Sequence, residues 1–209
     1  SLLLIAGFTI GFAFPHRLNM VLADGKYFRA GAGRLRRVAV FFVDDATRFG
    51  LHVVVGTEGE KTVLFLRGLY EMACKYGIAD CYYLDHGPGF ISLDTATVIG
   101  RLPSQPLLIH GEAVYPEGHG KIERFNRTVK AALLRNLGRP DVDPDYRALE
   151  LRLQHYLREV YNHEPHESLN NDTPAQRFHQ DPKQLRFAES DEWLRQQFLI
   201  TESRKVSGD

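Results

Sequence analysis

Cysteine is scarce in this sequence, which has only Cys74 and Cys81 among its 209 residues. The two do not form a CxxC pair, and two cysteines cannot form the framework of a disulfide-rich domain. A reducing, cytoplasmic setting is therefore the expectation from cysteine usage.

The sequence also lacks an excess of charge of either sign. Lys+Arg and Asp+Glu both number 26, so the formal net charge is zero. A purely electrostatic DNA binder is usually basic, and the balance argues mildly against that class. A nuclease-type domain can still be neutral, because an acidic metal site offsets basic groups elsewhere. Hydrophobic residues at 44% and charged residues at 25% are typical of a globular protein.

No hydrophobic run is long enough to cross a membrane. Residues 1–14 carry no charge, but they lack the basic start of a signal peptide and fall short of the about 20 residues of a spanning helix. We expect this stretch to form a strand or a packed arm, with no membrane partner. The chain does not begin with methionine, and we expect it to be a fragment of a longer protein.

Short apolar runs predict that the chain begins with an antiparallel meander. Strands are predicted at residues 19–23, 38–43 and 51–55, and the turn signal at residues 31–34 joins the first two. The run at 38–43 is continuously apolar, which is typical of a central strand covered on both faces.

The apolar period then becomes helical over residues 60–76, and Gly77 lies where a C-cap glycine belongs. A strand at 81–84, a short helix near 94–100 and a strand at 107–110 follow. Strand–helix–strand order implies parallel pairing with helices on the sheet faces. The expected buried stripe of the first helix is Val63, Leu66, Leu69, Tyr70 and Ala73.

Two longer helices are predicted at residues 119–137 and 145–162, and Thr173-Pro174 followed by Gln176 predicts a capping box and a short helix. The fold class is therefore α/β: a ribonuclease H-like, five-stranded mixed sheet, with a three-strand antiparallel meander followed by parallel strands, flanked by helices. The expected stripes are Ile122, Phe125, Val129 and Leu133 in the first helix, and Tyr146, Leu149, Leu153, Tyr156 and Val160 in the second.

Three carboxylates fall at informative places in this plan. Asp24 ends the first predicted strand, Asp85 ends the fourth, and Glu123 lies near the start of a helix. Any one of them alone is more often an ordinary surface charge. Three brought together by the fold would suit hard divalent cations, which prefer oxygen ligands, and two such ions can clamp a phosphodiester.

Four segments resemble the catalytic core of retroviral-integrase-like transposases, which carry an Asp-Asp-Glu (DDE) triad. Residues 116–130 resemble the signature around the third acid, and residues 84–90 resemble the segment of the second acid. Residues 43–48 resemble the second strand, and residues 161–175 resemble the closing segment. The tail, Phe198-Leu199 and residues 204–209, resembles the lead-in to the small β-barrel of Mu-type bacterial transposases.

The resemblance implies a DNA transposase or integrase that nicks transposon 3′ ends and joins them to target DNA by two-metal phosphoryl transfer. Asp24, Asp85 and Glu123 would be the catalytic acids and the ligands of two Mg²⁺ ions, for which Mn²⁺ can substitute, with Asp24 bridging both. The implied partners are transposon-end and target DNA and further copies of the protein assembled on that DNA. The implied location is the bacterial cytoplasm, in association with the nucleoid.

The sequence departs from the family pattern in three places. Asp85 and Glu123 are 38 residues apart, slightly more than the retroviral spacing, which bacterial relatives tolerate. No aromatic residue lies shortly before Asp24, and His86 replaces the asparagine that commonly follows the second acid. Asp44 and Asp45 therefore compete with Asp24 for the role of first acid. They end the second strand, which runs antiparallel to the first, so we expect them at the opposite edge of the sheet.

Two other functions stay open. The chain could be a catalytically idle DNA-binding or assembly relative of a transposase, or another ribonuclease H-like nuclease such as a junction resolvase. A zinc site at residues 163–167 is disfavoured, because the segment is not HExxH and Pro165 prevents the helical spacing. His166 is expected to make a structural hydrogen bond beneath the active site.

Basic residues accompany the predicted third acid. Glu123, Arg127 and Lys130 are spaced i, i+4, i+7, which places them on one helix face. An ordinary solvated ion-pair face is the alternative, but beside the Glu123 motif we favour DNA phosphate contacts by Arg127 and Lys130. Lys121 and Arg124 are expected helpers, and His119 is a candidate contact near the scissile phosphate.

The expected organisation has four parts. Residues 1–18 form an N-terminal arm, residues 19–140 the catalytic core, and residues 141–180 its helical closing segment. Residues 181–209 form a linker toward a truncated C-terminal barrel. The loop at residues 111–120, which contains three glycines, is expected to be mobile without DNA.

Overall fold

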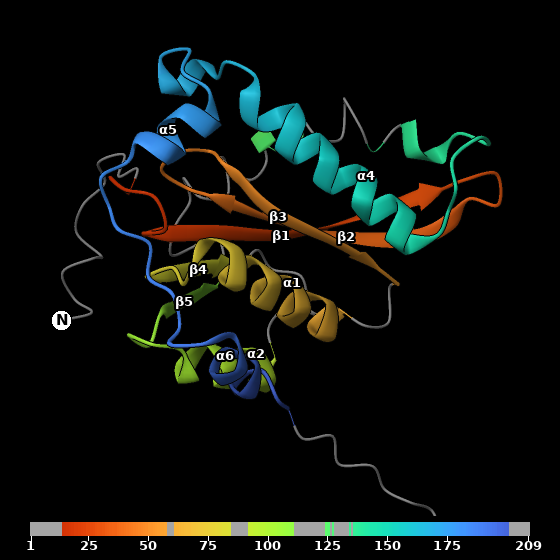
Figure 1. Ribbon diagram of the computed structural model, residues 1–209. Coiled ribbons are helices and arrows are strands. Elements are labelled where there is room, and N and C mark those ends of the chain that lie inside the picture. Colours follow the sequence, from red (N-terminus) through yellow and green to blue (C-terminus); the bar gives the residue numbers. More distant parts are fainter. Residues whose placement is uncertain are drawn as a thin grey trace, which may run out of the picture.

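The computed structural model describes residues 14–57, 61–84, 92–110, 124–125, 127, 134 and 136–200. A five-stranded sheet in the order β3-β2-β1-β4-β5 lies at its centre, with helices on both faces (Figure 1). The strands are β1 (Met20–Ala30), β2 (Leu35–Asp44), β3 (Gly50–Gly56), β4 (Cys81–Leu84) and β5 (Leu107–His110). The predicted fold class is confirmed.

The antiparallel half of the sheet is longer than the sequence pattern predicts. β1 and β2 pair from Val21↔Asp44 to Ala30↔Leu35, joined by the predicted turn, in which Gly31 has φ +65°. The expectation that the first strand ends at Asp24 is wrong. Pairing with β2 holds the polar residues that follow Asp24 in extended conformation, because the ladder satisfies their backbone groups regardless of side-chain polarity.

The parallel half forms as predicted. β4 and β5 have the predicted bounds, and β1, β4 and β5 pair in parallel. The crossover helices are α1 (Lys61–Tyr76) and α2 (Leu93–Arg101). The Gly77 N–H donates to Ala73 O at 2.9 Å, and Gly77 has φ +93°, which a Cβ-bearing residue rarely adopts.

Strand alternation divides the core between the two faces of the sheet. One face packs under α1, α2, α5 (Pro174–Gln180) and α6 (Asp191–Gln197), and the other packs under α4 (Tyr146–Glu159) (Figure 1). The first core includes Val21, Ala23, Val40, Phe42, Leu66, Leu69, Phe178 and Leu194. The α4 face includes Phe28, Phe41, Val43, Phe125, Leu149, Leu153 and Leu157.

Side chains cover the free edge of β3. The Val55 N–H donates to Glu150 at 2.7 Å, and the Gln154 side chain donates to the Val53 carbonyl at 3.0 Å. At the start of the strand, the Asn162 side-chain amide accepts the N–H of Gly50 and donates to the Gly50 carbonyl. An exposed strand edge is a template for pairing with another chain. The contacts from α4 and from the segment that follows α4 occupy this edge of β3.

The closing helices confirm one prediction and add an element. Thr173 and Gln176 form the predicted capping box at the start of α5. α6 was not predicted, and its Leu194 is 2% exposed within the core. Short 3₁₀ helices are η4 (Asn136–Gly138), η5 (Tyr161–His163) and η6 (Glu167–Leu169).

Of the predicted helix at 119–137, residues 124, 125 and 127 are helical, and the remainder lies largely outside the described residues. Within the described part of the chain, no helix has the length and apolarity needed to cross a membrane.

Candidate active site

Asp24 lies in the middle of β1, on the face of the sheet that α4 covers. Leu22 and Phe28 have the same parity in the strand and belong to the buried clusters of this face. Asp24 is 7% exposed and pairs across the ladder with Phe41 of β2. Its Oδ2 lies 2.9 Å from the Lys26 ammonium, so the buried carboxylate has a counter-charge within contact distance.

β4, the strand that precedes the second predicted acid, ends beside the residue before Asp24. β4 stops at Leu84, whose partner across the parallel ladder is Ala23. Asp85 is the next residue in the sequence and lies outside the described residues. The described structure therefore brings the end of β4 alongside the residue that precedes Asp24.

Phe125, two residues after the third predicted acid, packs against the strand pair that contains Asp24. Glu123 lies outside the described residues, but the Phe125 ring packs edge-on against Phe41 at 5.5 Å and against Tyr161 at 5.1 Å between centroids. Phe41 is the ladder partner of Asp24. Two residues after Glu123 in the sequence, the chain thus contacts the immediate neighbour of Asp24.

Only two of the expected DNA contacts are described. Arg124 and Arg127 are both helical and exposed, as a phosphate-binding role requires. His119, Lys121 and Lys130 lie outside the described residues, as do residues 111–120, so the expected mobility of that loop stays a prediction.

A further cationic group lies near Arg124. Arg48 follows the end of β2 with φ +61°, an uncommon conformation for a non-glycine residue, and its guanidinium lies 3.7 Å from Asp45. The pKa of His166 is lowered, first because burial disfavours the imidazolium and then because the positive charges of Arg48 and Arg124 oppose it. His166 makes a local hydrogen bond: its Nδ1 accepts the N–H of Ser168 at 3.3 Å and lies 2.9 Å from the Ser168 hydroxyl.

The rival acid Asp44 has a structural role. It is fully buried, and its carboxylate accepts hydrogen bonds from the N–H of Leu18 at 2.7 Å and from the N–H and hydroxyl of Thr47 at 2.9 and 2.6 Å. Burial raises its pKa to about 6, against these hydrogen bonds, which favour the charged form. Asp44 shares the parity of Phe42, which belongs to the core of the opposite face from Asp24.

Asp45, the other rival, is also fully buried and also lies apart from Asp24. Its N–H donates to the Met20 carbonyl at 3.0 Å, which places it at the start of β1. Four residues of extended strand separate Met20 from Asp24, or about 13 Å. Neither rival therefore lies at the junction of β1, β4 and the Phe125 segment.

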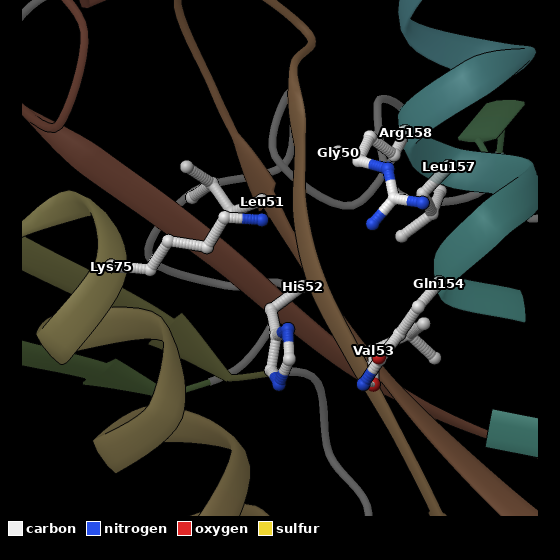
Figure 2. Close-up of a pocket in the computed structure, with 8 residues that line it drawn as sticks. All are labelled: Gly50, Leu51, His52, Val53, Lys75, Gln154, Leu157 and Arg158. Atoms are coloured by element: carbon white, nitrogen blue, oxygen red, sulfur yellow. Dashed lines mark hydrogen bonds between the residues drawn. The ribbon is translucent and has the colours of Figure 1, made fainter. Parts of the chain in front are cut away.

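Two cavities lined by described residues lie at the β3 edge. A cavity of about 60 Å³ is lined by Gly50, His52, Lys75, Gln154 and Arg158, among others (Figure 2). A larger groove of about 720 Å³ runs between α1 and α4 past Val55. None of the predicted acids lines either one. Among the described residues, no group of three or more His, Cys, Asp and Glu side chains is placed to hold a metal ion.

The sequence did not predict a role for two residues near the candidate site, Lys26 and Arg48. Lys26 is two positions from Asp24, and residues i and i+2 of a strand share a face, but the strand was predicted to end before it. Arg48 lies in the segment that resembles the family's second strand, yet its burial beside Tyr161 and His166 depends on contacts distant in sequence.

Comparison with known proteins finds relatives by sequence and by structure. No family model matches the sequence. The chain is 31% identical over 141 residues to the transposase for transposon Tn552 of Staphylococcus aureus, a match that covers 64% of this chain. It spans only 29% of the length of that protein.

Among solved structures, the chain resembles one from the simian T-cell lymphotropic virus intasome, determined in complex with the PP2A regulatory subunit B56 gamma. The TM-score is 0.63 at 17% sequence identity, covering 95% of this chain and 62% of that chain. At this identity the likeness establishes the fold. It confirms that the sheet and its flanking helices form the ribonuclease H-like core predicted from the sequence.

Proposed function

We propose that this chain is the catalytic region of a DNA transposase or integrase, in which Asp24, Asp85 and Glu123 form the active site. The observation that carries the proposal is the meeting of three segments at Asp24. Leu84 pairs with Ala23, and Phe125 packs on Phe41, the ladder partner of Asp24. The similarity to the Tn552 transposase and the fold shared with an intasome chain support the same conclusion.

Chain connectivity limits how far the two undescribed acids can lie from Asp24. Consecutive Cα atoms are about 3.8 Å apart, so Asp85 is one such step from Leu84 and Glu123 is two steps from Phe125. Strand alternation continued by one residue beyond Leu84 would direct Asp85 to the face of Asp24. These limits are compatible with a shared site and support the proposal.

The donor set fits divalent magnesium. Three carboxylates supply the hard oxygen ligands that Mg²⁺ prefers, and Mg²⁺ keeps several waters, so few protein ligands suffice. Once bound, two such ions lower the pKa of an attacking water or DNA 3′-hydroxyl and stabilise the departing oxygen. The burial of Asp24 also fits, because a carboxylate screened from bulk water on a rigid strand is held ready for a cation.

The remaining roles belong to cations of the chain. Arg124 and Arg127 are exposed on the segment that Phe125 anchors, where they can bind DNA phosphates and fix the strand relative to the acids. Further copies of the protein assembled on DNA are part of the proposal. A close relationship to Mu-type transposases, inferred from the tail sequence, is also part of the proposal.

The experiment is Mg²⁺-dependent nicking and joining of DNA by the full-length protein that contains this region. Asp24→Asn should abolish both reactions while DNA binding by electrophoretic mobility shift remains. Asp94→Asn, which neutralises an exposed acid on α2, is the matched control and should leave both reactions intact. A wild-type protein that binds DNA but neither nicks nor joins it would favour the idle assembly relative. Nicking of four-way junctions without joining would favour a junction resolvase.

A further inference from the structure

Asp24, the proposed metal ligand, forms an ion pair with Lys26. The Lys26 Nζ lies 2.9 Å from Asp24 Oδ2, with side-chain exposures of 33% and 9%. Both residues lie on β1 and share a face of the sheet, so the pair is built into the strand. A lysine ammonium at this distance places a full positive charge where a divalent cation would approach the carboxylate.

The surroundings of Asp24 explain why a counter-charge is useful. Its ladder partner Phe41 and its strand neighbour Leu22 are buried apolar residues, at 1% and 2% exposure. A carboxylate beside such groups loses hydration, and an ionised acid in a poorly hydrated place is costly unless a positive charge compensates it. Lys26 supplies such a charge in the metal-free protein.

The Lys26 ammonium can also move away from the Asp24 carboxylate. A third of its side chain is exposed, and its ladder partner on β2 is Ala39, the smallest side chain that could lie beside it other than glycine. Lysine carries its charge on a flexible four-carbon chain, so the ammonium can move into solvent without displacing the backbone. The strand that holds Asp24 therefore need not rearrange when the ammonium departs.

We propose that Lys26 is an internal counter-ion of Asp24 that a divalent cation must displace, so that Lys26 weakens metal binding and sets the metal concentration at which the site fills. The inference rests on the proposed function, because it takes Asp24 to be a metal ligand. Filling the site exchanges one ammonium for a divalent cation at the same carboxylate, and it releases Lys26 toward solvent. The predicted consequence is that the Asp24 carboxylate keeps a counter-charge when no metal ion is bound.

The test is calorimetric titration of the protein with MnCl₂, which measures binding without any reaction. Lys26→Met removes the charge and should strengthen Mn²⁺ binding about tenfold, which corresponds to about 1.4 kcal/mol. Lys26→Arg keeps the charge and should bind within about threefold of wild type. Lys75→Met removes one positive charge from the exposed surface of α1 and should have no effect. Lys26→Gln is a second neutral variant in case the methionine variant does not fold.

The Asp24→Asn variant distinguishes the metal site of the proposed function from the counter-ion role of Lys26. If it loses Mn²⁺ binding while the neutral Lys26 variants bind as wild type does, Asp24 is a metal ligand and the counter-ion inference is overturned. If Asp24→Asn binds Mn²⁺ as wild type does, or if neither wild type nor the neutral variants bind it, the metal site of the proposed function is itself wrong. Stronger binding by both neutral variants, with loss in Asp24→Asn, supports both.

Discussion

Asn162 holds the edge strand β3 through its side-chain amide, and its removal should show how much that contact contributes. Its Oδ1 accepts the N–H of Gly50 at 2.8 Å, and its Nδ2 donates to the Gly50 carbonyl at 3.1 Å. Asn162 is 2% exposed and Gly50 is buried. Both peptide groups of Gly50 that these bonds satisfy are therefore shielded from bulk water.

The magnitude follows from these two bonds. A hydrogen bond between neutral groups contributes about 1 kcal/mol net, and a buried group left unpaired costs about 1–3 kcal/mol. Asn162→Ala removes both bonds and leaves two backbone groups without their partner, so we expect the free energy of unfolding to fall by about 3 kcal/mol. For a domain of this size, that corresponds to a fall in Tm of about 6–12 °C.

Urea denaturation followed by circular dichroism measures the loss, and amide hydrogen exchange at Gly50 locates it. Gln196→Ala is the control, because Gln196 is exposed and its side-chain bond to Glu192 is long, at 3.5 Å. We expect the control to stay within about 0.5 kcal/mol of wild type. A loss below about 1 kcal/mol with Gly50 still protected from exchange would refute the reasoning.

Three further outcomes are expected. Gly77→Ala should destabilise the chain by more than about 1 kcal/mol in urea denaturation, because φ is +93° and the added Cβ would lie 2.5 Å from the Arg186 carbonyl; an unchanged midpoint would contradict this. The pKa of Asp44 is raised by burial from 3.8 to about 6, so the folded state binds its proton more tightly than the unfolded state. The free energy of unfolding should therefore fall by about 2 kcal/mol as pH rises from 4 to 6, out of about 3 kcal/mol lost in total between pH values well below 3.8 and well above 6. Asp44→Asn should lack that part of the decline, and identical pH profiles would exclude it. Arg127→Ala should weaken DNA binding by the full-length protein and lower the salt dependence by about one phosphate contact, and an unchanged slope in a mobility-shift titration would argue against a phosphate contact.

The sequence predicts the parallel half of the fold better than the antiparallel half. The strands at 81–84 and 107–110 have their predicted bounds, because each is a short apolar run with clear breaks on both sides. β1 was predicted to stop before Asp24 but continues to Ala30. Its second half, residues 25–30, mixes glycine and charged residues with apolar ones and has no continuous apolar run. Backbone pairing with β2 makes it a strand.

The buried faces of the helices were predicted with errors at the helix ends. Leu66 and Leu69 of α1 and Leu149 of α4 are buried as expected, but Val63, Tyr146 and Val160 are 53%, 38% and 37% exposed. Val63 and Tyr146 line the groove at the edge of β3, where the sheet offers nothing further to cover them. Helical periodicity identifies a face but not where the partner surface ends.

The candidate site, too, was predicted in part from the sequence and in part only from the fold. The importance of Asp24 comes from a sequence resemblance, and its setting between β4 and the Phe125 segment comes from the fold. The part played by Lys26 could not be predicted while the strand was thought to end before it. Asp44 shows why a pattern alone leaves alternatives open. Only the hydrogen bonds from Leu18 and Thr47 reveal that its carboxylate holds a turn.

The most direct test of the central claim is a crystal of the protein soaked in MnCl₂, with the ions located by anomalous scattering. Two peaks about 4 Å apart, in contact with Asp24 and with Asp85 and Glu123, are the predicted result. The pair should vanish from crystals of Asp24→Asn. Peaks beside Asp44 or Asp45 with none at Asp24, or no bound ion at the end of β4, would contradict the assignment of the active site.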